Sequence, residues 1–327
     1  MSPSQFVSQC TASSINDAAA VLANGGLVAF PTETVYGLGA DACNLDAVAR
    51  IYEVKGRPAD HPLIVHIASL QYLDQWADEI PEFAIALARD FWPGPMTLIL
   101  KRSEIAKDFI TGGQDTVGVR VPDHVVALAL LEAGHNVGIK GIAAPSANRF
   151  GQLSPTTAAA VQSELGKYMA QSDVVIDGGR CTVGVESTII DCTGDAPRVL
   201  RPGAITDAMI SESTGLLLLT HNAAKEVIRV SGALDNHYAP IATVILDQQP
   251  LAGQGFIALA NIDTPNGVIR LASPANDEEF AHLLYAALRD GDIQGLSHIV
   301  VTQPVGSGIA VAIRDRLTKA ANSSETA

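Results

Sequence analysis

The sequence predicts two domains: an α+β domain over residues 14–207 and a smaller, Rossmann-like α/β domain over residues 241–327, joined by a linker over residues 208–240. The first domain is predicted from many short apolar runs of strand length, which glycine and proline separate. The second is predicted from strand-like runs that alternate with runs of helix length, a pattern typical of a parallel sheet covered by helices. A chain of 327 residues is long enough to bury two cores.

Local signals predict the elements of the first domain. Helices are expected at residues 44–54, 81–91 and 154–166, and strands at residues 26–30, 62–67, 96–100, 116–121, 141–146, 173–179, 186–192 and 198–201. Asn44 is suited to cap the first helix, and Gly56 ends it. Pro81 suits the first turn of the second helix. The third helix is expected to open at Ser154 or Thr156.

The remaining residues predict a linker and a small parallel sheet. Residues 209–240 show no single period and are interpreted as a connector, which ends in an unusual pair, His237 and Tyr238. Beyond it, strands are expected at residues 242–247, 255–260, 267–272 and 297–303, and helices at residues 277–292 and 308–321. This alternation predicts the second domain.

The composition limits the class of ligand. The 21 Lys and Arg residues against 35 Asp and Glu residues give a formal charge of −14. Such a surface repels a polynucleotide, so any anion site must be a local cluster of cations and backbone N–H groups. The four cysteines lack zinc-ligand spacing, which indicates reduced thiols, a cytoplasmic protein and no metal site. We expect no signal peptide, and no apolar run approaches the ~18 residues of a membrane span.

Five polar stretches follow strand-like runs and favour an anionic ligand. They lie at residues 31–39, 55–62, 144–151, 184–189 and 201–203. Each places hydroxyls, amides or cations beside glycine or proline, where exposed backbone N–H groups suit phosphates and carboxylates. Glu186 lies in an apolar run, so its carboxylate needs a partner. The usual phosphate loops are absent from the sequence, because no G-x-x-x-x-G-K-[ST] or complete G-x-G-x-x-G occurs.

Each stretch by itself also fits a structural role. Lys55 fits the C-terminal cation of its helix, where the helix dipole favours it. Arg57 fits an ion pair with Asp60 or Glu53, and His66 inside an apolar run is typical of a buried core histidine. These residues alone leave the structural and the functional interpretation open.

Seven motifs together resemble a known family. They are PTETVYGLG, KGRPADHPLIVH, WPGPMTLIL, TVGVRVP, APSAN, GVESTI and LRPG, in this order. Their set resembles the YrdC-like family, and more closely its two-domain form, the threonylcarbamoyl-AMP synthases. The linker of that form ends in HYAP, the sequence found at residues 237–240 of this chain.

The resemblance implies a fold and an activity. The fold would be a twisted, mostly β core with a concave cavity. The activity would be that of an L-threonylcarbamoyladenylate synthase, a nucleotidyltransferase that makes threonylcarbamoyl-AMP and pyrophosphate from L-threonine, bicarbonate and ATP. Mg²⁺ would be held through the triphosphate. The product would pass to the machinery that modifies transfer RNA, with direct RNA binding weak or absent.

The resemblance also implies roles for individual residues. L-threonine would be held by Thr34, His66, Arg120, Ala144 (through its backbone) and Ser187. ATP would be contacted by Lys55, Arg57, His61, Thr116, Ser146, Asn148, Ser154, Arg201 and Tyr238, with Lys55 and Arg57 catalytic. Tyr238 would cover ATP as part of a lid. His61 departs from the family, which often has Asn at this position.

Three other functions fit parts of the sequence. A YrdC-like module could bind double-stranded RNA, although the acidic composition argues against this. A carbamoyl-transfer domain of the kind used in hydrogenase maturation is fused to zinc-finger modules, of which this sequence shows no sign. A nucleotide-binding regulator would place its activity in the C-terminal domain.

Overall fold

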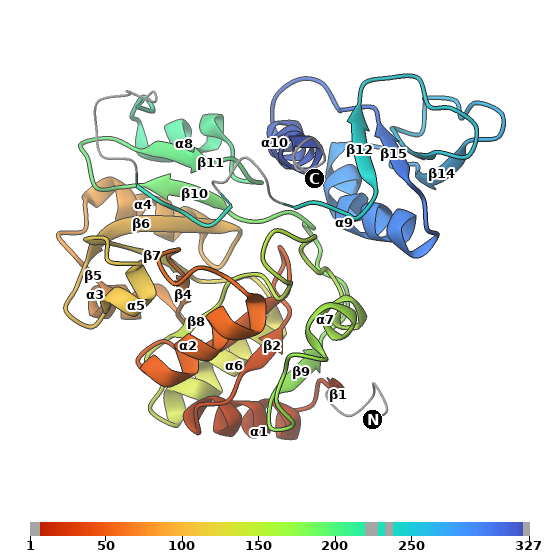
Figure 1. The fold of residues 1–327 in the computed structure, drawn as a ribbon. Helices are drawn as coiled ribbons and strands as arrows, with labels where there is room; N and C mark the ends of the chain where they lie inside the picture. The colour runs from red at the N-terminus through yellow and green to blue at the C-terminus, as the bar shows by residue number, and fades with distance from the viewer. Residues whose placement is uncertain (1–6, 220–227, 233–237, 323–327) are drawn as a thin grey trace.

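The computed structural model describes residues 7–219, 228–232 and 238–322, which form two domains (Figure 1). Each domain is built on a sheet of its own. The two-domain architecture expected from the sequence is confirmed. No helix in these residues is long and apolar enough to cross a bilayer.

The described part of the first domain contains one eleven-stranded sheet. Its order is β1-β9-β2-β3-β8-β4-β7-β6-β10-β11, and β5 pairs with β6. The strands are β1 (Val7–Gln9), β2 (Val28–Phe30), β3 (Gly37–Asp41), β4 (Ile64–His66), β5 (Ala77–Asp78), β6 (Met96–Arg102), β7 (Thr116–Arg120), β8 (Ile142–Ala143), β9 (Val174–Asp177), β10 (Thr188–Asp191) and β11 (Arg198–Arg201). Pairing is mixed: β4 runs parallel to β7, while β6 runs antiparallel to β7. The predicted α+β class with a large β core is therefore confirmed.

The helices cover the sheet and shape its loops. They are α1 (Ala12–Ala23), α2 (Leu45–Lys55), α3 (Leu73–Trp76), α4 (Glu82–Phe91), α5 (Asp108–Thr111), α6 (Val125–Asn136), α7 (Ala158–Leu165) and α8 (Asp207–Thr214), with a 3₁₀ turn at Leu70–Tyr72. The predicted caps of α2 are present: the Asn44 side chain accepts from two backbone N–H groups, and Gly56 adopts a left-handed conformation. Arg57 follows this turn directly and has a buried side chain.

Several helices differ from the sequence predictions. The helices α1, α3, α5 and α6 were not predicted, and α8 occupies part of the expected connector and packs against α4. Pro81 is the N-cap of α4 and not a residue of its first turn. The opening of α7 was also predicted wrongly, because Thr157 caps this helix. Ser154 instead donates its hydroxyl to the Glu186 carboxylate, which is 2.6 Å away.

The second domain is a four-stranded parallel sheet, as predicted. Its order is β12-β15-β13-β14. The elements are β12 (Thr243–Leu246), β13 (Gly255–Ile257), β14 (Ile269–Ala272), α9 (Asp277–Ile293), β15 (His298–Val301) and α10 (Ile309–Asn322). Both helices lie between this sheet and the first domain (Figure 1). The two domains share an apolar core, in which Val35, Leu153 and Val185 of the first domain meet residues of α9 and α10 such as Leu284 and Ile313.

Gly184 lies where the backbone of the first domain closely approaches α9. Its φ is +86°, and a Cβ atom there would lie 2.5 Å from the Ala281 carbonyl oxygen of α9. Gly179 has a φ of +87° but no described atom within 4 Å of such a Cβ. Comparing substitutions at the two glycines therefore distinguishes the cost of an unfavourable backbone conformation from the cost of disturbing the contact between the domains.

We expect Gly184→Ala to destabilise the protein more than Gly179→Ala. Both substitutions force alanine into a left-handed conformation, at a cost of roughly 1–2 kcal/mol. Only alanine at position 184 would also push α9 away from the first domain, because a backbone atom cannot turn aside. Urea denaturation measures both free energies of unfolding, and equal losses would show that the domains do not depend on this contact.

Candidate active site

A cavity lies in the first domain where the ends of several strands meet the loop between β2 and β3. Its wall consists of Thr32, Thr34, Val35, Gly37, Arg57, Ile64, His66, Arg120, Ala144, Pro145, Ser146, Glu186, Ser187, Arg201, Ser231, Gly232 and Tyr238. Parallel pairing of β4 and β7 places His66 beside Arg120. Arg201 ends β11, and Ser187 directly precedes β10. The fold thus gathers residues from all the polar stretches at one place.

The structure brings together the residues assigned to L-threonine by resemblance. All five line the cavity: Thr34, His66, Arg120, Ala144 and Ser187. The Arg120 guanidinium donates to the Thr34 hydroxyl at 3.0 Å and to the Gly94 carbonyl oxygen at 3.3 Å. Burial, reinforced by the nearby Arg120 cation, lowers the pKa of His66 to about 3, so the imidazole is neutral at pH 7.

Glu33 is a neighbour of this group that sequence reasoning missed. Its carboxylate is buried and lies 2.7 Å from Nη2 of Arg120. The contact is ionic, because neither carboxylate oxygen has a hydrogen-bond partner among the described residues. An acid between two threonines at a strand end was the available signal, but only the fold shows that Arg120 is its partner. Glu33, which is not among the residues of the cavity wall, balances the charge of Arg120.

The residues assigned to ATP divide into two groups. Arg57, Ser146, Arg201 and Tyr238 line the cavity. The other five, which are Lys55, His61, Thr116, Asn148 and Ser154, are absent from its wall. Thr116 faces a smaller neighbouring cavity that Ser231 and Ile64 share with the main one. The His61 ring packs edge-on against Phe150, with 5.2 Å between ring centroids.

Lys55 and Arg57 hold different positions. The buried Lys55 Nζ donates to the carbonyl oxygens of Ser146, at 2.5 Å, and Asn148, at 2.6 Å. Burial lowers its pKa, and the Arg57 cation adds to this. Lys55 therefore ties the end of α2 to the APSAN loop. Arg57 reaches the cavity, and in the described residues it forms no ion pair with Asp60.

The linker contributes to the same cavity. The Ser231 hydroxyl accepts from Arg57 at 3.1 Å, and its carbonyl oxygen accepts from Arg201 at 2.9 Å. Tyr238 is buried and has a φ of +63°. Its neighbour His237 lies outside the described residues. Ser231 and Tyr238 thus occupy the wall that faces Arg57 and Arg201.

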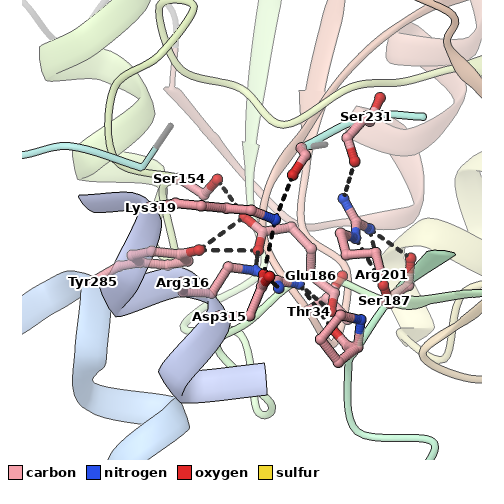
Figure 2. Close-up of polar contacts among 12 residues, drawn as sticks. Thr34, Ser154, Glu186, Ser187, Arg201, Ser231, Tyr285, Asp315, Arg316 and Lys319 are labelled. Carbon is pink, nitrogen blue, oxygen red and sulfur yellow. Dashed lines mark hydrogen bonds and ion pairs between the residues drawn. The ribbon is translucent and has the colours of Figure 1, made fainter. Parts of the chain in front are cut away.

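Glu186 has the partners that its sequence context required. Tyr285 of α9 donates to both carboxylate oxygens, at 2.9 and 3.1 Å, and Arg316 of α10 donates at 2.7 Å (Figure 2). Burial acts to raise the pKa of Glu186, but the Arg316 and Arg201 cations and the Ser154 hydrogen bond outweigh it and lower the pKa to about 2. No local pattern could have indicated these partners, which lie about a hundred residues away in sequence.

Comparison with known proteins decides the family. The Sua5–YciO–YrdC family model, described as telomere recombination, matches residues 20–203. A second model, the threonylcarbamoyl-AMP synthase C-terminal domain, matches residues 205–322. The chain belongs to this family. Its likeness to the two-domain members extends over nearly the whole chain.

Relatives of this kind include named synthases. Threonylcarbamoyl-AMP synthase of Pyrococcus abyssi is 42% identical, with 94% of this chain and 93% of that protein covered. The synthase of Bacillus subtilis is 39% identical, with 94% and 92% covered. The crystal structure of P. abyssi Sua5 complexed with L-threonine matches with a TM-score of 0.86 and 39% identity, covering 98% of both chains.

Shorter family members match the first domain alone. Escherichia coli YciO has a TM-score of 0.51 and 26% identity, covering 60% of this chain and 93% of its own. The family therefore includes chains that lack the second domain, and Glu186 of this chain is paired with residues that only two-domain members supply. The second domain therefore contacts the cavity wall through Glu186, while the described lining residues belong to the first domain and the linker.

Acid should weaken the protein through Glu186. Because the folded-state pKa lies below the ordinary value of 4.5, the stability that this carboxylate contributes is complete above about pH 4.5 and is lost as the pH falls toward 2. The loss should be on the order of 3 kcal/mol for this group. Denaturation curves from pH 6 to pH 2 should show a shallower decline for Glu186→Gln than for the wild type. Parallel declines would mean that Glu186 is not held ionised by its partners.

Proposed function

We propose that the protein is an ATP-dependent L-threonylcarbamoyladenylate synthase, a nucleotidyltransferase that supplies transfer-RNA modification in the cytoplasm. The observation that carries this proposal is the joining of two sets of residues in one cavity. The set assigned to L-threonine and the arginines assigned to ATP line the same wall. The likeness to named threonylcarbamoyl-AMP synthases supports the proposal, as does the likeness to a Sua5 structure with L-threonine.

L-Threonine would bind at the Arg120 end of the cavity. A guanidinium has five N–H donors, and the hydrogen bonds of Arg120 to Gly94 and Thr34 use two of them. The remaining donors suit the carboxylate of the amino acid. The neutral His66 adds no second positive charge beside it. The Thr34 hydroxyl and the Ala144 backbone would contact the rest of the substrate.

ATP would bind at the other end of the cavity, which carries Arg57 and Arg201. Arg57 and Arg201 both face the cavity, where a guanidinium can grip phosphate oxygens in pairs. In the described structure both arginines donate to Ser231 of the linker, so that a triphosphate would have to replace these contacts. Lys55 would act by holding the loop at Ser146 and Asn148 in place. Tyr238 would cover the nucleotide.

Magnesium would enter with the nucleotide. The described residues contain no group of three or more His, Cys, Asp or Glu side chains that could hold a metal ion. The one carboxylate among the described residues of the cavity wall, Glu186, already has three partners. The donor set therefore does not suit a resident cation, and the triphosphate is the better ligand for Mg²⁺.

The reaction needs placement and charge neutralisation more than a protein nucleophile. Bicarbonate and the threonine amine form a C–N bond, a C–O bond of bicarbonate breaks, and a carbamate and water result. A carbamate oxygen then attacks the α-phosphorus of ATP, and the bond to the bridging oxygen breaks, so that pyrophosphate leaves. The carbamate, the carboxylate and the triphosphate bring three negative groups together. Arg57, Arg120 and Arg201, which line the cavity, would stabilise them.

Pyrophosphate release tests the proposal directly. The wild type should release pyrophosphate from ATP only when both L-threonine and bicarbonate are present, and an adenylate of mass equal to threonylcarbamoyl-AMP should appear by mass spectrometry. ATP consumption that does not depend on L-threonine and bicarbonate would reject the synthase function. An RNA-binding function would instead give a tight, salt-sensitive gel shift without catalysis.

Arg57→Met should lower kcat/KM for ATP by about 100-fold or more, because one positively charged contact to the triphosphate is lost. The matched control is Arg102→Met, since Arg102 pairs with Asp108 on the surface away from the cavity. Steady-state kinetics should show the control close to the wild type. Equal activity of all three proteins would return Arg57 to a structural role.

A further inference from the structure

Glu186 poses an electrostatic problem for a cavity that binds anions. It is a carboxylate on the same wall as Arg57 and Arg201. A free negative charge there would repel a triphosphate and compete for Arg201. Arg201 itself is held at the neighbouring residue, because its Nε and Nη2 atoms donate to the Ser187 carbonyl oxygen at 3.1 and 2.9 Å.

The second domain supplies most of the groups that satisfy this carboxylate. The described contacts of Glu186 are Ser154 of the first domain, Tyr285 of α9 and Arg316 of α10. Figure 2 shows the carboxylate between the two residues of the second domain on one side and Arg201 with Ser187 on the other. Without the second domain, Glu186 would keep only the hydroxyl of Ser154 from this set.

Arg316 is built into this place. Its side chain has no exposed surface, although it is an arginine. Nε pairs with Glu186, Nη1 pairs with Asp315, and Nη2 donates to the Pro202 carbonyl oxygen at 3.1 Å. Pro202 follows Arg201 directly. Arg316 therefore contacts Glu186 in the cavity wall and also Pro202, the residue next to the phosphate-binding candidate Arg201.

Arg316 also contacts Tyr238, the aromatic residue of the linker that lines the cavity. Its guanidinium carbon is 5.3 Å from the centre of the Tyr238 ring, within the range of a cation–π contact. The Tyr285 ring also packs near Tyr238, with 5.8 Å between the centroids of the two tyrosine rings. The residue that would cover ATP is thus supported by the second domain.

We infer that Arg316 is a positioning residue for the nucleotide: it neutralises Glu186 in the cavity wall, so that Arg201 remains available to phosphate and Ser154 and Tyr238 keep their places. The inference deepens the proposed function and rests on it in taking the nucleotide to be ATP. It gives the second domain a role in the reaction without a contact to the reacting atoms. Of the residues assigned to L-threonine, Ser187 directly follows Glu186 in sequence and accepts a hydrogen bond from Arg201.

Calorimetric titration with a non-hydrolysable ATP analogue tests the inference independently of catalysis. Arg316→Met should weaken binding of the analogue about tenfold or more, because Glu186 is left as an unpaired charge. L-Threonine should bind within about twofold of the wild type, since its other contacts lie elsewhere. Adding Glu186→Gln to Arg316→Met should restore most of the lost nucleotide affinity, because the charge that Arg316 neutralised is gone.

Arg289→Met is the matched control. Arg289 pairs with Glu164 across the same domain boundary at 2.6 Å, but neither residue lines the cavity. A role in domain docking alone would make Arg289→Met and Arg316→Met behave alike. Nucleotide affinity in Arg316→Met that equals the wild type would overturn the inference, and so would a double variant no better than Arg316→Met. If the wild type binds the analogue but makes no adenylate, the proposed function fails and the inference about nucleotide binding does not.

Tyr285→Phe keeps the test open if Arg316→Met does not fold. This substitution removes only the hydroxyl that donates to Glu186 and leaves the ring in the core. Nucleotide affinity should fall about threefold or more, because the carboxylate loses part of its stabilisation. Thermal melting checks that the variant is folded. Unchanged nucleotide affinity in a folded Tyr285→Phe protein would contradict the inference.

Discussion

The buried carboxylate of Glu186 is the constraint on which the candidate site depends. A carboxylate without charged partners is costly inside a protein, and it is more costly beside a site that must accept three negative groups. The structure meets this requirement with Arg316 from one domain and Ser154 from the other. The ion pair between Glu186 and Arg316 therefore joins the two domains beside the cavity. Moving the domains apart would leave Glu186 with an unbalanced negative charge near the bound nucleotide.

The two ends of the cavity are built by different means. At the end proposed for L-threonine, Arg120 is balanced by Glu33 and held in register between parallel strands, all within the first domain. At the nucleotide end, Arg57 and Arg201 meet the linker, and the second domain lies behind it. A chain of net charge −14 can in this way hold anions, because the cations are gathered locally and the nearby acids are paired.

The sequence predicted local structure well where one short signal decided it. Helix α2 begins after Asn44 and ends at Gly56 as expected, and the predicted strands and the parallel second sheet are present. Five helices were missed, namely α1, α3, α5, α6 and α8, although Thr11 and Ser14 form a capping box at the start of α1. Ser154 resembled a helix cap but bonds to Glu186, since a buried charge outweighs a cap that Thr157 provides equally well. The motifs predicted which residues gather, but the partners of Glu186 depend on packing between domains.

A crystal structure with L-threonine and a non-hydrolysable ATP analogue would test the central claim most directly. We expect the threonine carboxylate on Arg120 and the triphosphate on Arg57 and Arg201, with Glu186 still paired to Arg316. The separate groove between α7 and α9, which is lined by Lys167, offers another place for an anion. A nucleotide bound in that groove, with L-threonine alone in the cavity, would contradict the account.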